Sequence, residues 1–241
     1  MICYHPPIMK KPQFTEGPIY HIYNRGVEKR NVFQRDRDYL RFVHDLYEFN
    51  DSDSVSNLWY YFNPKTSEVE PHYIPRERKQ RKVLVEILAF VLMPNHYHLI
   101  VRQLRKNGIV NFMQKLGTGY TMYFNKLNHR VGALFQGRFK AVLVEETPHF
   151  IYLPLYVHAN PLKIYRGSTS IDKTMKYLEE YRWSSFPDYT GKKNFPSITS
   201  RSFLKECFGG EQEQRDAMRD FIKTKMEDLE NIRDMTLDSD F

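Results

Sequence analysis

The most strongly patterned stretch of the chain is VLVEILAFVLMPNHYHLIVRQ, residues 83–103. Two runs rich in β-branched and aromatic residues flank a break at residues 93–95, and this pattern predicts two strands joined by a tight turn. The second strand carries His96 and His98. Because side chains alternate between the faces of a strand, both imidazoles point to one face and Tyr97 points to the other. This strand therefore presents two nitrogen ligands side by side.

Hydrophobic periodicity predicts the other elements as well. They are a strand over 19–27, a helix from Asp36 or Asp38 to about Phe49, a helix over 109–127, a strand over 139–146, a helix from 147 that stops before Pro161, a short helix over 173–181 and one or two amphipathic helices after 201. This order favours an α+β fold. We expect a four-stranded antiparallel sheet of the ferredoxin-like kind, with helices packed on one face and the histidine strand in its centre.

The chain divides into three parts. The sequence predicts an extended N-terminal arm over residues 1–17, a single folded domain over residues 18–190 and a helical extension over residues 191–241. Within the domain, residues 50–82 lack steady periodicity and predict a long loop that ends in a basic run. Its cations are Arg76, Arg78, Lys79, Arg81 and Lys82, and a solvated charge run is the favoured interpretation over a DNA contact.

Composition and charge narrow the function classes. The net charge is +7, and residues 1–200 hold 29 Lys and Arg against 18 Asp and Glu. Such a balance suits a polyanion such as nucleic acid, although it also occurs on ordinary solvated surfaces. Cys3 and Cys207 lie far apart without a partner motif, which argues against a disulfide framework or a cysteine-based zinc site. The start lacks a signal-peptide pattern and no apolar run reaches membrane-spanning length, so we expect a cytoplasmic protein without a membrane partner.

A pair of histidines on one strand is by itself weak evidence of a metal site, because a divalent ion needs further ligands. Residues 147–165, TPHFIYLPLYVHANPLKIY, offer a third. Tyr156 and Asn160 are four residues apart and so share one helix face. A metal held by His96, His98 and the amide oxygen of Asn160 would lie beside the Tyr156 phenol.

Five motifs occur in an order that is typical of a known family. They are YNRG (Tyr23–Gly26), MPNHYHLIV (Met93–Val101), LFQGRFK (Leu134–Lys140), YVHANPL (Tyr156–Leu162) and YRWSSF (Tyr181–Phe186). In this combination the chain resembles the REP-associated tyrosine transposases, within the insertion-sequence-200-like group of HUH single-tyrosine transposases. The resemblance runs from about Pro18 to about Tyr189 and implies the same palm-like α+β fold.

The resemblance also implies the chemistry. Members of the family are metal-dependent DNA endonucleases and strand transferases that cleave and rejoin single-stranded or hairpin DNA through a covalent 5′-phosphotyrosine. Carried over to the matching positions, His96, His98 and Asn160 bind Mg²⁺ or Mn²⁺, and Tyr156 is the nucleophile. Two departures exist. The third ligand is often Gln in transposase relatives, and Pro154 predicts a kink in the helix that carries the tyrosine.

The same resemblance implies contacts with palindromic single-stranded DNA or a DNA hairpin. Arg and Lys side chains suit phosphates, and Asn and Gln suit base edges. The candidate residues lie in or beside the matching motifs and are Asn24, Arg25, Arg130, Gln136, Arg138 and Lys140. A homodimer is left open, because the tyrosine helix serves a partner subunit's histidines in transposase relatives while some REP-associated members act as monomers.

Three alternatives remain open at this point. A plasmid relaxase or replication initiator shares HUH chemistry, but there the tyrosine usually precedes the histidines, whereas Tyr156 follows them. A catalytically silent DNA- or RNA-binding module would keep the fold, although the intact set of four site residues argues against it. A hydrolytic metalloenzyme without a covalent step predicts that Tyr156→Phe leaves cleavage largely intact.

Several other residues of the right chemical type are assigned to packing. Tyr120 is a rival nucleophile, but it lies several turns from any ligand pattern, on a helix whose aromatics predict a core or dimer surface. We do not expect His21, His149 or His158 to bind the metal. His158 lies two residues from both Tyr156 and Asn160 and therefore points away from the helix face that they share.

Overall fold

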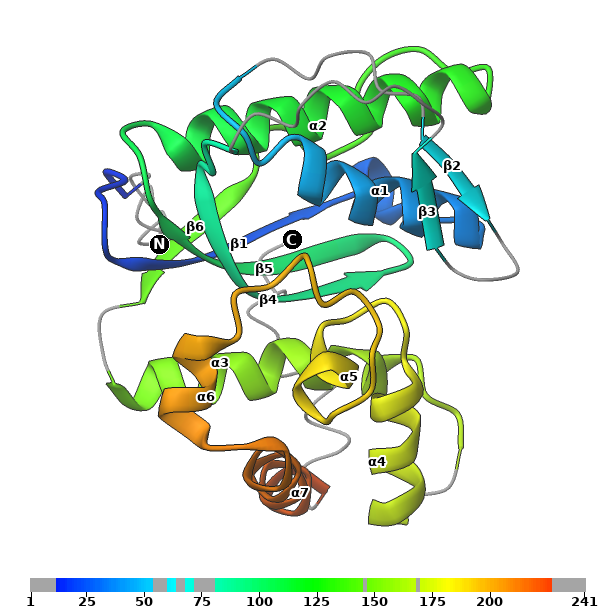
Figure 1. Cartoon of the computed structure of the whole chain (residues 1–241). Coiled ribbons are helices and arrows are strands. Elements are labelled where there is room, and N and C mark those ends of the chain that lie inside the picture. The colour runs from blue at the N-terminus through cyan, green and yellow to red at the C-terminus, as the bar shows by residue number, and fades with distance from the viewer. Residues whose placement is uncertain are drawn as a thin grey trace, which may run out of the picture.

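The strand pattern of the sequence produces a four-stranded antiparallel sheet in the order β4-β5-β1-β6 (Figure 1). The computed structural model describes residues 12–53, 60–63, 68–71, 81–144, 147–167 and 170–226. The strands of this sheet are β1 (Ile19–Arg25), β4 (Val85–Met93), β5 (His96–Gln103) and β6 (Lys140–Val144). The predicted sheet and its hairpin at residues 83–103 are confirmed, and the histidine strand β5 is internal.

Helices cover both faces of this sheet, so the prediction that they pack on one face is wrong (Figure 1). α1 (Asp36–Glu48) and α2 (Gly108–Leu127) pack on one face, and α3 (Thr147–Ala159) packs on the other. The remaining helices are α4 (Ile171–Glu180), α5 (Phe186–Tyr189), α6 (Ser202–Phe208) and α7 (Glu211–Met226). Both faces of the sheet are covered because β4, with the sequence VEILAFVLM, is apolar and buried at nearly every position. Such a strand needs apolar cover on both sides.

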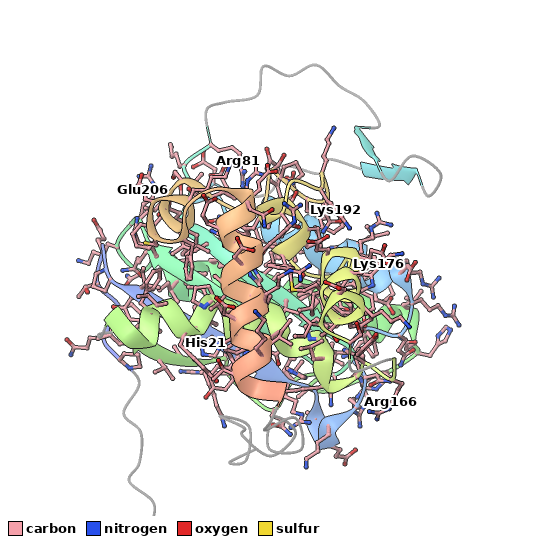
Figure 2. All side chains as sticks on the ribbon, turned by 90° about the horizontal axis from the view of Figure 1, so that it is seen from below. His21, Arg81, Arg166, Lys176, Lys192 and Glu206 are labelled. Carbon is pink, nitrogen blue, oxygen red and sulfur yellow. The ribbon has the colours of Figure 1, made fainter. Side chains whose placement is uncertain are left out.

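C-terminal helices pack against α3 on the side that faces away from the sheet. Met218 and Ile222 of α7 join a core with Leu155 and Ala159 of α3 and with Leu178 of α4. Figure 2 views the molecule from this side, with α7 in front of α3. No helix within the described ranges is long and apolar enough to cross a membrane.

The insertion between α1 and β4, where the sequence predicts a long loop over residues 50–82, contains short strands. These are two antiparallel strands, β2 (Tyr60–Asn63) and β3 (Glu68–Pro71), which form a separate two-stranded sheet. Strands of four residues are too short to show a clear period in the sequence. Of the basic run, Arg76, Arg78 and Lys79 lie outside the described residues, as do the N-terminal residues 1–11 and the last residues from 227 onward.

The two described cations of that run are engaged locally. The Arg81 guanidinium lies 3.8 Å from the centre of the Tyr47 ring and donates to the carbonyl oxygen of Asn50. Lys82 forms an ion pair with Asp53, with 3.3 Å between Nζ and Oδ1. These contacts agree with a structural or solvated role for both side chains.

Strand register decides which side chains accompany the histidines. Directly opposed residues of antiparallel strands place their side chains on the same face. His98 lies opposite Tyr23 and His96 lies opposite Arg25. Lys140 of β6 lies opposite Tyr23 on the other side and extends the same row. α3, which carries Tyr156, packs over β4 and β5. The row formed by His98, Tyr23 and Lys140 therefore runs from α3 across β1 to β6 at the edge of the sheet.

Candidate metal and nucleophile site

His98 lies in the buried middle of β5 and is only 1% exposed. Its Nδ1 atom is 2.9 Å from Nε2 of His21 on β1, and the two ring planes are nearly parallel, with 5.1 Å between centroids. Its Nε2 atom is buried and has no hydrogen-bond partner among the described residues. Burial lowers the pKa of His98 well below its usual value, and the nearby charges of Lys163 and Arg25 lower it further. His98 is therefore a neutral imidazole, the form that binds metals.

His96 is oriented by its neighbour Asn95. The Nδ1 atom of His96 is 2.6 Å from the amide oxygen of Asn95, whose amide nitrogen donates to the Lys29 carbonyl. That second bond fixes the amide so that its oxygen faces the imidazole. An amide oxygen can only accept, so Nδ1 carries the proton and the buried Nε2 atom carries the lone pair. This is the arrangement in which a second residue prepares a histidine for metal binding.

Asn160 follows the last residue of α3 and opens the short 3₁₀ turn η2 (Asn160–Lys163). Its amide nitrogen donates to the carbonyl oxygens of Tyr156, at 3.0 Å, and Val157, at 3.5 Å. These bonds satisfy carbonyls at the helix end and fix the orientation of the amide. Its Oδ1 atom is buried and receives no hydrogen bond within the described part of the chain. An unsatisfied buried acceptor costs about 1–3 kcal/mol, and this oxygen is able to bind a water molecule or a cation.

Tyr156 lies on α3 against the histidine strand. It is 8% exposed, and its ring meets that of His98 edge to face, with 6.0 Å between centroids. Tyr152, one turn earlier, stacks on it at 6.3 Å. The Lys163 ammonium lies 3.5 Å from the phenol oxygen. One chain thus brings together the predicted nucleophile, the predicted ligands and a lysine that the sequence interpretation did not single out.

The donor set fits a hard divalent ion. It combines two imidazoles, which bind divalent transition ions, with one amide oxygen, a donor that suits Mg²⁺ or Mn²⁺. Among the described residues no group of three or more His, Cys, Asp or Glu side chains is arranged to hold a metal ion, and the candidate donor set at this place includes the amide of Asn160 instead. The fit therefore rests on the buried Nε2 of His98 and the buried Oδ1 of Asn160.

Two of the residues assigned to packing, Tyr120 and His158, have hydrogen-bond partners outside the donor set. Tyr120 is fully buried and donates its hydroxyl to the Val32 carbonyl at 2.6 Å, which leaves it no access to DNA. His158 points to Ser185, with 2.8 Å between Nε2 and Oγ. The side chain of His149 lies outside the described residues. His21 differs from Tyr120 and His158, because it contacts a predicted ligand directly although nothing in the local sequence indicates this pairing.

Two of the predicted DNA-contacting residues are neighbours at the end of β1 and face opposite sides of the sheet. Arg25 lies on the histidine face, and its Nε atom is buried without a hydrogen-bond partner in the described part of the chain. Asn24 lies on the other face, where its amide donates to the Gly137 carbonyl at 3.2 Å and accepts from the Arg25 backbone at 2.9 Å. Asn24 therefore holds the loop before β6, whereas Arg25 is available to a ligand beside His96.

The other four predicted DNA contacts surround this loop. Gln136 and Arg138 are exposed, and Lys140 is exposed at the first position of β6. The backbone of Gln136 donates to the Arg25 carbonyl, which anchors the loop to the end of β1. Arg130 donates to the Asn125 side chain at 3.0 Å. The fold gathers most of the set near one end of β1, and their role in DNA binding stays a prediction.

Residues 61–160 match the family described as "Transposase IS200 like". The matched stretch contains both histidines, Tyr156 and Asn160, and it confirms the resemblance that the motifs indicate. A solved structure described as a REP-associated tyrosine transposase bound to a REP hairpin is similar, with a TM-score of 0.48 and 14% sequence identity. That similarity covers 80% of this chain and 94% of the other. No curated protein matches the sequence.

Proposed function

We propose, from the match of residues 61–160 to the IS200-like transposases and from the site within it, that this protein is a metal-dependent DNA transposase. It cleaves and rejoins single-stranded or hairpin DNA through a covalent 5′-phosphotyrosine. One observation carries the proposal. Tyr156 lies against His98 in the same chain, and two buried atoms of the predicted ligands, Nε2 of His98 and Oδ1 of Asn160, have no hydrogen-bond partner among the described residues. A module that only bound DNA would have no need to leave these atoms unsatisfied.

His96, His98 and Asn160 would hold Mg²⁺ or Mn²⁺, which when bound withdraws charge from the scissile phosphodiester and orients it. Neighbouring residues orient the two imidazoles toward the site. Both imidazoles have Nδ1 engaged by a neighbour, so their Nε2 atoms are directed to the site. Because all three ligands are neutral, they leave the positive charge of the ion uncompensated for the phosphate.

In the covalent step, Oη of Tyr156 attacks the phosphorus atom. A bond forms between Oη and phosphorus, and the bond from phosphorus to the 3′ oxygen of the preceding nucleotide breaks. The phenol loses its proton and the departing 3′ oxygen gains one, so a 3′ hydroxyl is released. Lys163 lies beside Oη and favours the phenolate through its charge. The phosphotyrosine keeps the energy of the phosphodiester, and attack by a 3′ hydroxyl reverses the step and rejoins the strand.

The DNA strand would approach along the half of the histidine face that lies next to α3. Arg25 and Lys140 lie on this face, opposite His96 and Tyr23 respectively. Their charges suit consecutive phosphates on either side of the scissile one. Gln136 and Arg138, exposed on the adjoining loop, are positioned to contact bases or phosphates of the flanking hairpin.

Tyr156 would act on DNA bound at the histidines of its own chain. Its ring contacts His98 directly, and α7 supports α3 from behind through Met218 and Ile222. A mixture of His96→Ala and Tyr156→Phe proteins should therefore remain inactive. If each subunit instead served a partner, the mixture would regain activity by complementation.

The proposal is tested with single-stranded oligonucleotides that carry palindromic hairpins from the DNA flanking the gene, in the presence of Mn²⁺ or Mg²⁺. A label at the 3′ end should move with the protein on a denaturing gel, whereas a label at the 5′ end should leave on a shorter strand. Tyr156→Phe and addition of a chelator should each abolish the adduct. Tyr165→Phe, which alters a tyrosine stacked on Tyr177 away from the donor set, is the matched control and should keep it.

Other outcomes identify the alternatives. Cleavage without an adduct, retained in Tyr156→Phe, would indicate a metal-activated water and refute the covalent mechanism. Binding of the hairpin without cleavage or adduct would favour the silent DNA-binding module.

A further inference from the structure

We propose that His21 is a positioning residue that holds the proton of His98 on Nδ1 and so directs the Nε2 lone pair of His98 to the metal. This inference rests on the metal site proposed above and adds a residue to it. Neither the motifs nor the spacing of histidines in the sequence assigns a role to His21.

The contact between the two histidines is close and shielded from water. His21 Nε2 and His98 Nδ1 are 2.9 Å apart, and the rings are nearly parallel, with 16° between their planes. His21 is 2% exposed and His98 is 1% exposed, so water does not compete for the bond. The register of β1 and β5 places His21 diagonally across from His98, opposite Ile100, on the same sheet face. Two strands of the central sheet therefore hold this pair in place.

Only one direction of this hydrogen bond is compatible with metal binding. When His98 donates from Nδ1 to Nε2 of His21, the Nε2 atom of His98 carries a lone pair. When His21 donates instead, the proton of His98 must sit on its own Nε2 atom. There it would be a buried donor without an acceptor in the described part of the chain, and it would block the ion. An acceptor at His21 Nε2 thus selects the tautomer of His98 that can ligate.

The second ligand has an equivalent arrangement. The amide oxygen of Asn95 accepts from Nδ1 of His96 at 2.6 Å, which leaves Nε2 of His96 to ligate. Asn95 and His21 come from different parts of the chain and use different chemical groups. Both nevertheless place an acceptor on the Nδ1 atom of a ligand, which is the usual means of orienting a metal-bound imidazole.

A purely structural role for His21 makes different predictions from a positioning role. His21→Phe keeps an aromatic ring beside Tyr23 and His98 but removes the acceptor. His21→Gln loses the ring but places an amide oxygen near the position of Nε2. If His21 only packs, the Phe variant should bind metal more tightly than the Gln variant. If His21 positions the ligand, the Gln variant should bind metal more tightly than the Phe variant.

The experiment measures Mn²⁺ binding to the full-length protein without DNA, from the decrease in the electron paramagnetic resonance signal of free Mn²⁺. We expect His21→Phe to weaken binding by about 10- to 100-fold and His21→Gln to recover most of that loss. His158→Phe is the matched control, because it alters another buried histidine with a single side-chain hydrogen bond, and it should leave Mn²⁺ affinity unchanged. Nitrogen NMR of the metal-free protein should show the His98 proton on Nδ1 in the wild type and a mixture of tautomers in His21→Phe.

The outcomes separate this inference from the function on which it rests. Wild-type binding of Mn²⁺ that is lost in His98→Ala establishes the metal site. If the site is established and His21→Phe binds as tightly as the wild type, or binds better than His21→Gln, the positioning role is refuted. If the wild type binds no Mn²⁺, or His98→Ala binds it equally well, the metal site itself is refuted and the inference with it.

Discussion

Replacement of Asn160 by leucine separates the metal-binding role of this residue from its role in the fold. The side chain is 2% exposed, and only its amide nitrogen has partners in the described part of the chain. Leucine has a similar shape and no polar atoms. The substitution removes the bond to the Tyr156 carbonyl, worth about 1 kcal/mol, and it also removes the unsatisfied Oδ1 atom, which costs about 1–3 kcal/mol. We therefore expect the metal-free variant to be at least as stable as the wild type, with a gain of about 0–2 kcal/mol.

The difference should appear when metal is added. At an Mn²⁺ concentration of about 100 times Kd, a ligand that binds only the folded state adds about 2.7 kcal/mol to its stability. For a chain of this size each kcal/mol raises Tm by roughly 2–4 °C, so the wild type should gain about 5–11 °C. Asn160→Leu lacks the third ligand and should gain little.

Calorimetry or dye-monitored melting, with chelator and with Mn²⁺, gives both quantities. Asn50→Leu is the matched control, because Asn50 is a buried asparagine whose amide is fully used. It donates to the Val85 carbonyl and accepts from the backbones of Leu84 and Val85. Its loss should cost about 2–4 kcal/mol and leave the Mn²⁺ shift intact. A loss of more than about 1 kcal/mol in metal-free Asn160→Leu, or an undiminished Mn²⁺ shift, would refute the reasoning.

Three further predictions follow from single contacts. Lys163→Gln removes the cation beside the phenol of Tyr156 and should slow adduct formation on the order of 100-fold, measured by the time course of the labelled adduct, without weakening Mn²⁺ binding. Burial lowers the pKa of His158 to about 3, so below about pH 6.5 the unfolded chain binds a proton there that the folded chain does not. Stability should therefore fall with decreasing pH between these values, and His158→Phe should flatten the slope by about 1.4 kcal/mol per pH unit in urea titrations. Tyr120→Phe removes a buried bond to the Val32 carbonyl and should cost about 1–3 kcal/mol in urea unfolding while leaving adduct formation unchanged.

Each of these predictions has an opposing result. Lys163→Arg keeps the charge and should retain most of the rate, so equal losses in the Arg and Gln variants would show that charge is not the cause. An unchanged pH slope in His158→Phe would mean that burial does not lower the pKa of this imidazole in the folded protein. Loss of the adduct in a stably folded Tyr120→Phe would reopen the question of which tyrosine attacks.

The sequence correctly predicted features that depend on local geometry. The hairpin at residues 83–103 follows from two apolar runs around a proline, and the shared face of His96 and His98 follows from the two-residue period of a strand. The α3 helix and its stop at the Asn160–Pro161 step follow from the conformational limits of proline. Spacing alone thus placed the candidate nucleophile and third ligand on adjacent turns.

Contacts between distant segments could not be predicted in the same way. The cover on both sheet faces, the pairing of His21 with His98 and the position of Lys163 beside Tyr156 each join residues through packing or strand register. Register between β1 and β5 depends on how many residues lie in the turns and helices between them and on which side chains pack best. The sequence determined which residue types share a face of each element, because that is fixed by backbone geometry. Only the tertiary structure decided which faces meet, because that depends on the packing of the whole chain.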